Sequence, residues 1–254
     1  MALDIVDLRE FYASPLGRVV RDLLKMRLTR IWRDVAGEEI LALGYATPLL
    51  RPWLAEARAI LAMMPENQGA AYWPKEGPNV VCLANLLHLP LEEESVSRII
   101  MLHALENMND PEAFLREAWR VLKSGGRALI IVPNRRGLWA HADSTPFGTG
   151  RPYSARQLKA LLREQGFYVE RSYQALFWPP RHSRFSQMLM RAVEPLGRFL
   201  PFTCGGIHVV EVGKQLYSPT LVGAKRPRRR LVVPLSFPRP SNPIPTNRNT
   251  SKTV

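Results

Sequence analysis

Two side chains that could carry acid–base chemistry, His103 and Asn107, follow a short apolar strand pattern at residues 98–102. Loops at strand ends often present ligand-binding side chains, and an imidazole titrates near neutral pH. We therefore predict His103 and Asn107 as candidate catalytic residues that position a nucleophile or accept its proton. A helix-cap or core histidine is the structural alternative for His103, and we expect the neighbouring Glu106 to be a solvated turn acid.

Histidine and cysteine spacing gives no sign of a metal site. The chain has five histidines and two cysteines, Cys82 and Cys204, and none of them falls at a spacing typical of zinc ligands. Cys82 lies in an apolar strand pattern, which indicates a buried, reduced thiol. We predict that the protein binds no structural metal.

The elements that must position His103 and Asn107 are clearest between residues 85 and 134. A polar turn leads to an apolar strand, then to a helix that begins with Asp110 and Pro111, a Gly125–Gly126 turn and a second apolar strand. Asp at the N-cap, Pro at the first helical position and Gly after the last turn are the expected boundary residues.

The rest of the chain alternates between strand and helix signals, which predicts a Rossmann-like, doubly wound, mostly parallel seven-stranded sheet with helices on both faces. The two strands nearest the C-terminus lack a long crossover, so an antiparallel edge is allowed. We predict strands at 40–43, 59–63, 79–83, 98–102, 127–132, 167–177 and 207–213, and helices at 8–35, 48–57, 111–123, 154–165 and 183–198.

Charge divides the 254-residue chain into unequal parts. Residues 214–254 contain nine Lys or Arg and no acid, so they account for +9 of the net +13 and leave +4 (13 − 9) for the rest. We predict an N-terminal helical cap at 1–37, a catalytic-type domain at 38–213 and a basic, Pro-rich, disordered tail at 214–254. Nucleic acid or an anionic surface is a conceivable partner only for that tail. No apolar run is long enough to cross a bilayer, and the N-terminus lacks a signal pattern, so we expect a cytoplasmic protein.

The stretch from Asn85 to Pro133 resembles the class I S-adenosylmethionine-dependent methyltransferases, in the small-molecule branch. The resemblance is carried by Leu89–Pro90, the acids at 92–94, the run from Leu105 to Pro111 and the segment RVLKSGG at 120–126. It implies S-adenosylmethionine as cofactor, bound over the carboxyl ends of the strands, and a small-molecule acceptor. Loops at the carboxyl ends of strands usually carry substrate contacts, so we expect such contacts in the loop at 134–151, with a flexible surface connection as the alternative.

The first loop departs from the glycine-rich pattern of that family. Of its glycines only Gly44 remains; Ala46 and Pro48 replace the other two, and Ala42 replaces the acid. Met64 stands where the resemblance leads us to expect a ribose-binding carboxylate, with Glu66 two residues later, and Asn85 replaces an Asp. The cofactor-binding residues implied by the resemblance are Gly44, Tyr45, Ala46, Met64, Asn85 and Leu86.

Three classes of function remain to be weighed. Methyl transfer from S-adenosylmethionine to a small molecule is the leading interpretation. A catalytically inactive methyltransferase-like binding or scaffold protein is the alternative, because the first loop and the ribose acid are altered. A nicotinamide-dependent oxidoreductase is disfavoured, since no GxGxxG sequence follows the strand at 40–43.

Overall fold

The computed structural model describes residues 3–197 and 204–214 of the chain. The predicted disorder of the basic tail therefore falls outside the described residues, apart from Lys214. Among the residues described, no helix is both long and apolar enough to span a membrane.

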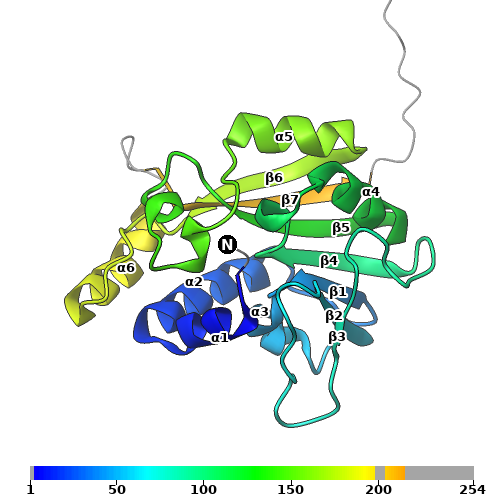
Figure 1. Ribbon diagram of the computed structural model, residues 1–254, viewed down its shortest axis with the longest axis horizontal. Coiled ribbons are helices and arrows are strands. Elements are labelled where there is room, and N and C mark those ends of the chain that lie inside the picture. Colours follow the sequence, from blue (N-terminus) through cyan, green and yellow to red (C-terminus); the bar gives the residue numbers. More distant parts are fainter. Residues whose placement is uncertain (1–2, 198–203, 215–254) are drawn as a thin grey trace, which may run out of the picture. The chain divides into compact units, whose positions relative to one another are not determined.

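Seven strands form one sheet in the order β3-β2-β1-β4-β5-β7-β6 (Figure 1). The first five strands in the chain pair in parallel, whereas β7 runs antiparallel to both of its neighbours. The predicted mostly parallel seven-stranded sheet is confirmed, but the antiparallel strand lies inside the sheet, with β6 at the edge. The strands are β1 (Glu39–Gly44), β2 (Ala59–Met64), β3 (Val81–Leu83), β4 (Val96–Leu102), β5 (Leu122–Pro133), β6 (Phe167–Ala175) and β7 (Ile207–Lys214).

The helices are shorter and more divided than the sequence pattern predicts. The expected helix at 8–35 is two helices, because Ser14 caps the second one through Gly17 N and Pro15 begins it. The expected helix at 48–57 ends early, since Pro52 interrupts it and leaves a short 3₁₀ turn. The helices are α1 (Ile5–Ala13), α2 (Pro15–Ile31), α3 (Thr47–Leu50), α4 (Pro111–Val121), α5 (Ala155–Glu164) and α6 (Arg184–Gly197), with 3₁₀ turns at Arg51–Trp53, Leu105–Asn107, Leu138–His141 and Pro146–Gly148.

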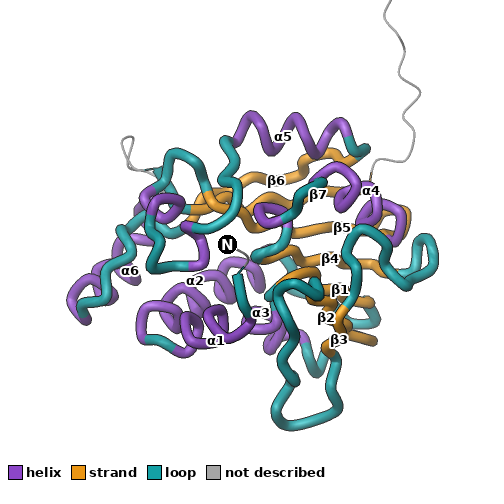
Figure 2. The backbone as a smooth tube through the Cα atoms, in the orientation of Figure 1, coloured by secondary structure: helices purple, strands orange, loops and turns teal. Residues whose placement is uncertain are grey.

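Helices cover both faces of the sheet, and each face has its own core. Alternate β1 residues point to opposite sides, so Ile40 and Ala42 pack with α1 and α2, whereas Leu41 and Leu43 pack with α4 and α5. Figures 1 and 2 show α1, α2 and α3 grouped together, away from α4 and α5. Because α1 shares a core with the sheet, the N-terminal helices are an integral layer of the described protein.

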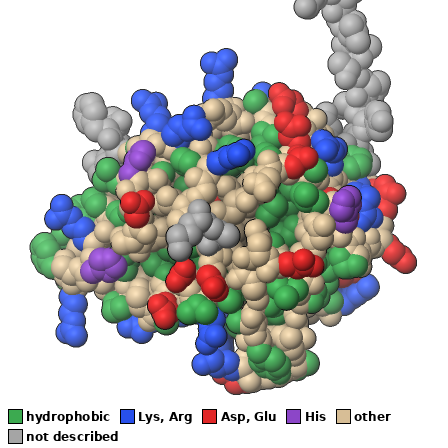
Figure 3. All heavy atoms as spheres, viewed as in Figure 1, with side chains coloured by type: hydrophobic (Ala, Val, Ile, Leu, Met, Phe, Trp, Pro, Cys, Tyr) green, Lys and Arg blue, Asp and Glu red, His purple; other side chains and the backbone are tan. Residues whose placement is uncertain are grey.

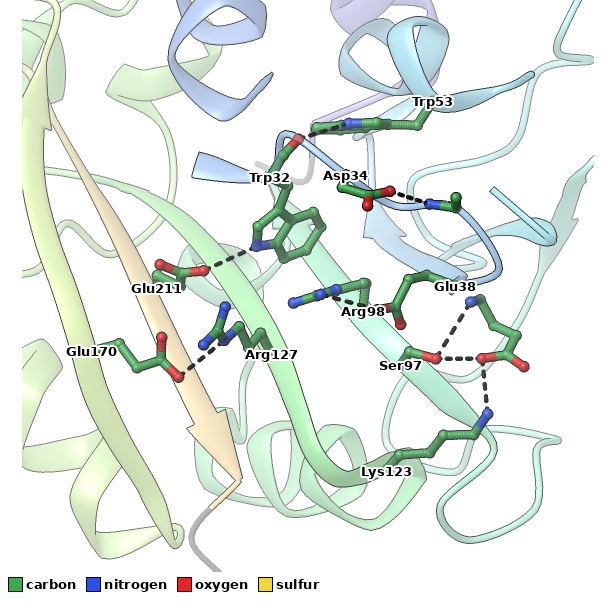
Figure 4. Close-up of polar contacts among 12 residues, drawn as sticks. Trp32, Asp34, Glu38, Trp53, Ser97, Arg98, Lys123, Arg127, Glu170 and Glu211 are labelled. Atoms are coloured by element: carbon green, nitrogen blue, oxygen red, sulfur yellow. Dashed lines mark hydrogen bonds and ion pairs between the residues drawn. The ribbon is translucent and has the colours of Figure 1, made fainter. Parts of the chain in front are cut away.

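A polar network closes the amino-terminal edge of the sheet (Figure 4). Trp32 Nε1 donates to Glu211 Oε1 at 3.0 Å, and the Arg98 guanidinium lies 5.4 Å from the centre of the Trp32 ring. Glu39 accepts hydrogen bonds from Ser97 and from Lys123, whose Nζ is 2.8 Å away. These bonds hold the pKa of Glu39 at about 2. The network ties the end of α2 to four strands, β1, β4, β5 and β7, and leaves the carboxyl edge for ligands.

Candidate active site at the carboxyl edge of the sheet

The loop after β1 turns on a single glycine. Gly44 has a φ of +77°, and a Cβ at this position would lie 2.4 Å from the Leu102 carbonyl oxygen and 2.9 Å from Ala104 Cβ. Ala46 has a φ of −94° and therefore needs no glycine, and Pro48 lies in the first turn of α3, where its missing N–H is harmless. The altered loop is therefore compatible with the fold, and Gly44 is required by packing between the ends of β1 and β4.

The segment after β2 supplies a polar group that the sequence does not single out. Met64 is buried and Glu66 is exposed, whereas Gln68 is only 5% exposed. Gln68 Nε2 donates to the His103 carbonyl at 3.4 Å, and its Oε1 has no partner among the described residues. Gln68 thus brings a buried acceptor to the place where the sequence comparison leads us to expect a carboxylate. The only indication of Gln68 in the sequence is that a polar residue stands four positions after the end of β2.

The segment after β3 is built around an Asx turn. Asn85 Oδ1 accepts a hydrogen bond from Leu87 N at 2.9 Å, and the Asn85 side chain is exposed. Leu86 is 2% exposed and packs in the core beneath α4 and α5. The structure therefore places Asn85 at the rim of the carboxyl edge and Leu86 beneath it.

His103 lies at the centre of a buried chain of polar groups directly after β4. Its Nε2 is 2.9 Å from the Tyr12 hydroxyl, and its Nδ1 is 3.5 Å from Glu106 Oε1. The side chains of His103 and Glu106 are both 0% exposed. The prediction that Glu106 is a solvated turn acid is wrong, because the 3₁₀ turn after β4 points its carboxylate inward.

The backbone at His103 is left-handed, with a φ of +52°, which is unusual for a residue with a side chain. Its carbonyl accepts hydrogen bonds from Gln68 Nε2 and, at 3.2 Å, from Asn107 Nδ2. Asn107 therefore contacts the backbone of His103. Strained residues of this kind persist where surrounding contacts hold them, and they concentrate at functional sites.

Helix α1 lies across these strand ends. Ile5 N donates to the Gln68 carbonyl at 2.7 Å, and the Tyr12 ring is 5.7 Å from the Tyr45 ring and 5.9 Å from that of His103. Burial raises the pKa of Tyr12 well above its usual range, and the nearby Tyr45 and Glu106 raise it further. The helix thus contacts the segments that follow β1, β2 and β4.

A cavity of about 920 Å³ lies next to α1, between α1, α2, the loop after β1 and residues 70–75. Of the predicted cofactor residues, Tyr45 lines the cavity; Gly44, Ala46, Met64, Asn85 and Leu86 do not. Tyr12 also lines it, so this residue touches both the cavity and His103. Neither His103 nor Asn107 lines the cavity directly.

The loop at 134–151, for which substrate contacts are predicted, also contributes to the protein interior. Trp139 is fully buried and its Nε1 donates to the Trp178 carbonyl at 2.8 Å. Phe147 is 1% exposed, and its ring centre is 4.8 Å from that of His103. The Phe147 ring therefore packs against the imidazole of His103, and the Trp139 ring packs in turn against Phe147 at 5.7 Å.

Comparisons with known proteins agree with this geometry. The family model for the methyltransferase domain matches residues 41–130, from β1 into β5. A Mycobacterium tuberculosis protein named as a probable S-adenosylmethionine-dependent methyltransferase is 33% identical over 141 residues, which make up 54% of this chain and 50% of the relative. A Mycolicibacterium smegmatis relative with the same designation is 30% identical over 145 residues, or 56% of each chain. The chain thus spans about half the length of these curated relatives.

Solved structures support the fold. A Thermotoga maritima S-adenosylmethionine-dependent methyltransferase has a TM-score of 0.56 at 16% identity, covering 83% of this chain and 96% of that one. An Archaeoglobus fulgidus S-adenosylmethionine-dependent methyltransferase has a TM-score of 0.53 at 15% identity, covering 76% of this chain and 94% of that one. The resemblance inferred from the sequence is confirmed: residues 41–130 match the methyltransferase-domain model, and the described chain has the fold of the S-adenosylmethionine-dependent methyltransferases.

Proposed function

We propose that this protein transfers a methyl group from S-adenosylmethionine to a small-molecule acceptor, and that it does so in the cytoplasm. The observation that carries the proposal is the family match over residues 41–130, because that segment builds β1 to β4 and the loops at their carboxyl ends. Open α/β sheets bind ligands at this edge. The designations of the relatives support the same cofactor and reaction class.

The groups at this edge fit the polar parts of the cofactor. The unpartnered, buried Oε1 of Gln68 can accept a hydrogen bond from a ribose hydroxyl, in place of a carboxylate. Tyr45 also borders the 920 Å³ cavity, so the region assigned to the cofactor adjoins a second space whose volume lies within the common range of ligand sites, roughly 300–1,000 Å³. We assign the cofactor to the region bounded by Gln68 and by the predicted residues Gly44, Tyr45, Ala46, Met64, Asn85 and Leu86.

When bound, the cofactor supplies a methyl group already activated on a sulfonium, so the protein mainly has to align the acceptor and remove its proton. We propose that His103 is the base and that it acts through Tyr12, which faces the cavity. Because the pKa of Tyr12 is raised, its hydroxyl keeps its proton until His103 Nε2 accepts it, while the acceptor proton moves onto the Tyr12 oxygen. Glu106 beside Nδ1 stabilises the resulting imidazolium, and Asn107 positions the His103 turn.

The cofactor assignment is tested by calorimetry and thermal unfolding of the full chain with S-adenosylhomocysteine. Ligand at 100 times its Kd adds about 2.7 kcal/mol of stability, which is a clear rise in the unfolding midpoint. Gln68→Met removes both polar atoms at similar length, and the loss of one hydrogen bond of about 1.4 kcal/mol weakens binding roughly tenfold. Glu66→Gln, two residues away and exposed, is the matched control and should bind as the original chain does.

An unchanged midpoint at millimolar S-adenosylhomocysteine would reject the enzyme and favour the alternative of an inactive binding or scaffold protein. Binding that Gln68→Met and Glu66→Gln leave equally unaffected would retain the cofactor but remove Gln68 from its site. Both results can be interpreted without knowing the identity of the methyl acceptor.

A further inference from the structure

The walls of the 920 Å³ cavity carry a large excess of positive charge. Five cationic side chains line it against a single acid, Glu10. On the face seen in Figure 3, Lys and Arg side chains are scattered among acidic and apolar ones. The cations that line the cavity are Arg9 from α1, Arg21 and Lys25 from α2, Arg51 from the turn after α3, and Lys75 from the loop after β2.

The protein itself neutralises little of this charge. Arg21 pairs with Asp22 at 3.3 Å, and Arg51 pairs with Glu76 at 3.3 Å with both side chains more than 60% exposed. Exposed pairs of this kind contribute little, about 0–1 kcal/mol. Within the described part of the chain, Arg9, Lys25 and Lys75 make no ion pair with an acid.

The position of Lys25 gives independent support for a crowded cation cluster. Its pKa is lowered by burial and then by the nearby charges of Arg21 and Arg51, and Asp22 opposes this only in part. Like charges brought together in this way are unfavourable unless a counter-charge joins them. The cluster therefore favours the binding of an anion.

The cofactor does not meet this requirement. S-adenosylmethionine carries a sulfonium, an ammonium and one carboxylate, so it adds a net positive charge to the region. An anionic partner must come from the other substrate. Tyr12, Tyr45, Tyr72 and Trp73 supply aromatic walls for its organic part.

We propose that the cavity is the acceptor site and that the methyl acceptor is a phosphate-bearing small molecule, held by Arg9, Lys25 and Lys75 with its nucleophile toward Tyr12. Guanidinium groups bind phosphate oxygens in pairs, and lysine ammonium groups add point charges. The role of this ligand as methyl acceptor rests on the proposed methyl transfer. The existence of the anion site does not depend on it.

Inorganic pyrophosphate is the probe, measured by calorimetry on the full chain with and without S-adenosylhomocysteine. We expect binding that Arg9→Gln with Lys25→Gln weakens by about tenfold or more, since charge-assisted hydrogen bonds are lost. Lys75→Gln lies on an exposed loop and should weaken binding without disturbing folding. Arg30→Gln is the matched control, because Arg30 is exposed on α2 and does not line the cavity.

Equal binding by the original chain and the three cavity substitutions would overturn the proposal, and would place the anion on another basic segment such as residues 214–254. Weakening by Arg30→Gln to the same degree would also overturn it, because the effect would then follow total charge. Pyrophosphate binding without S-adenosylhomocysteine binding would leave the anion site in place and reject methyl transfer. The converse result would reject the anion site and keep methyl transfer.

Discussion

The strongest structural prediction concerns Gly44→Ala. Gly44 has a φ of +77°, and a new Cβ would meet the Leu102 carbonyl oxygen at 2.4 Å and Ala104 Cβ at 2.9 Å. A left-handed alanine costs about 1–2 kcal/mol, and overpacking in a rigid interior adds about 1–3 kcal/mol. We therefore expect Gly44→Ala to lower the free energy of unfolding by about 2–5 kcal/mol.

Gly37→Ala separates the two contributions. Gly37 has a φ of +76°, but nothing lies within 4 Å of an added Cβ, so only the conformational cost of about 1–2 kcal/mol applies. Urea unfolding followed by tryptophan fluorescence would measure both variants. Equal losses for Gly44→Ala and Gly37→Ala would refute the argument that the β1 and β4 ends pack around Gly44.

Three further substitutions test side chains that the structure places in polar contacts. Glu39→Gln should lower the free energy of unfolding by about 1–2 kcal/mol at neutral pH. Because the pKa of Glu39 in the folded protein is lowered from 4.5 to about 2, this difference is fully present above pH 4.5. Acid-unfolding curves should show it fading as the pH falls toward 2. Trp32→Phe leaves the buried carboxylate of Glu211 without its 3.0 Å donor and should cost about 1–3 kcal/mol in urea unfolding; a loss below 0.5 kcal/mol, roughly, would contradict this role. Tyr12→Phe should lower kcat about 10²-fold or more and shift its pH profile while S-adenosylhomocysteine binding stays intact; an unchanged profile would exclude Tyr12 from proton transfer.

Much of the sheet could be predicted because its strands are short apolar runs separated by strong boundary residues. Asp110 and Pro111 mark the start of α4, whereas the Gly125–Gly126 pair expected to end the helix lies inside β5, which already begins at Leu122. The break at Ser14–Pro15 was readable in principle, since Ser before Pro is a typical helix start. The apolar periodicity continues across that break, however, and the pattern alone therefore favours one long helix.

The candidate site was harder to predict, because its contacts join residues far apart in the sequence. His103 could be singled out from its place after β4, but its partner Tyr12 lies 91 positions away in a helix read only as a cap. Glu106 looks like a turn acid until the 3₁₀ geometry turns it inward. Gln68 has only a weak local signal, a polar residue four positions beyond β2, and its role depends on the neighbouring strand ends.

Helix α1 has a consequence for how fast ligands can exchange. This helix covers the strand ends. Its apolar residues also belong to the core shared with α2 and the sheet, and they include Leu8, Phe11 and Tyr12. Displacing this helix from the sheet would therefore expose hydrophobic surface, at a free-energy cost of about 25 cal/mol for each Å² exposed. Mutations that anchor α1 more firmly should raise the melting temperature and slow turnover together, and those that loosen it should do the reverse.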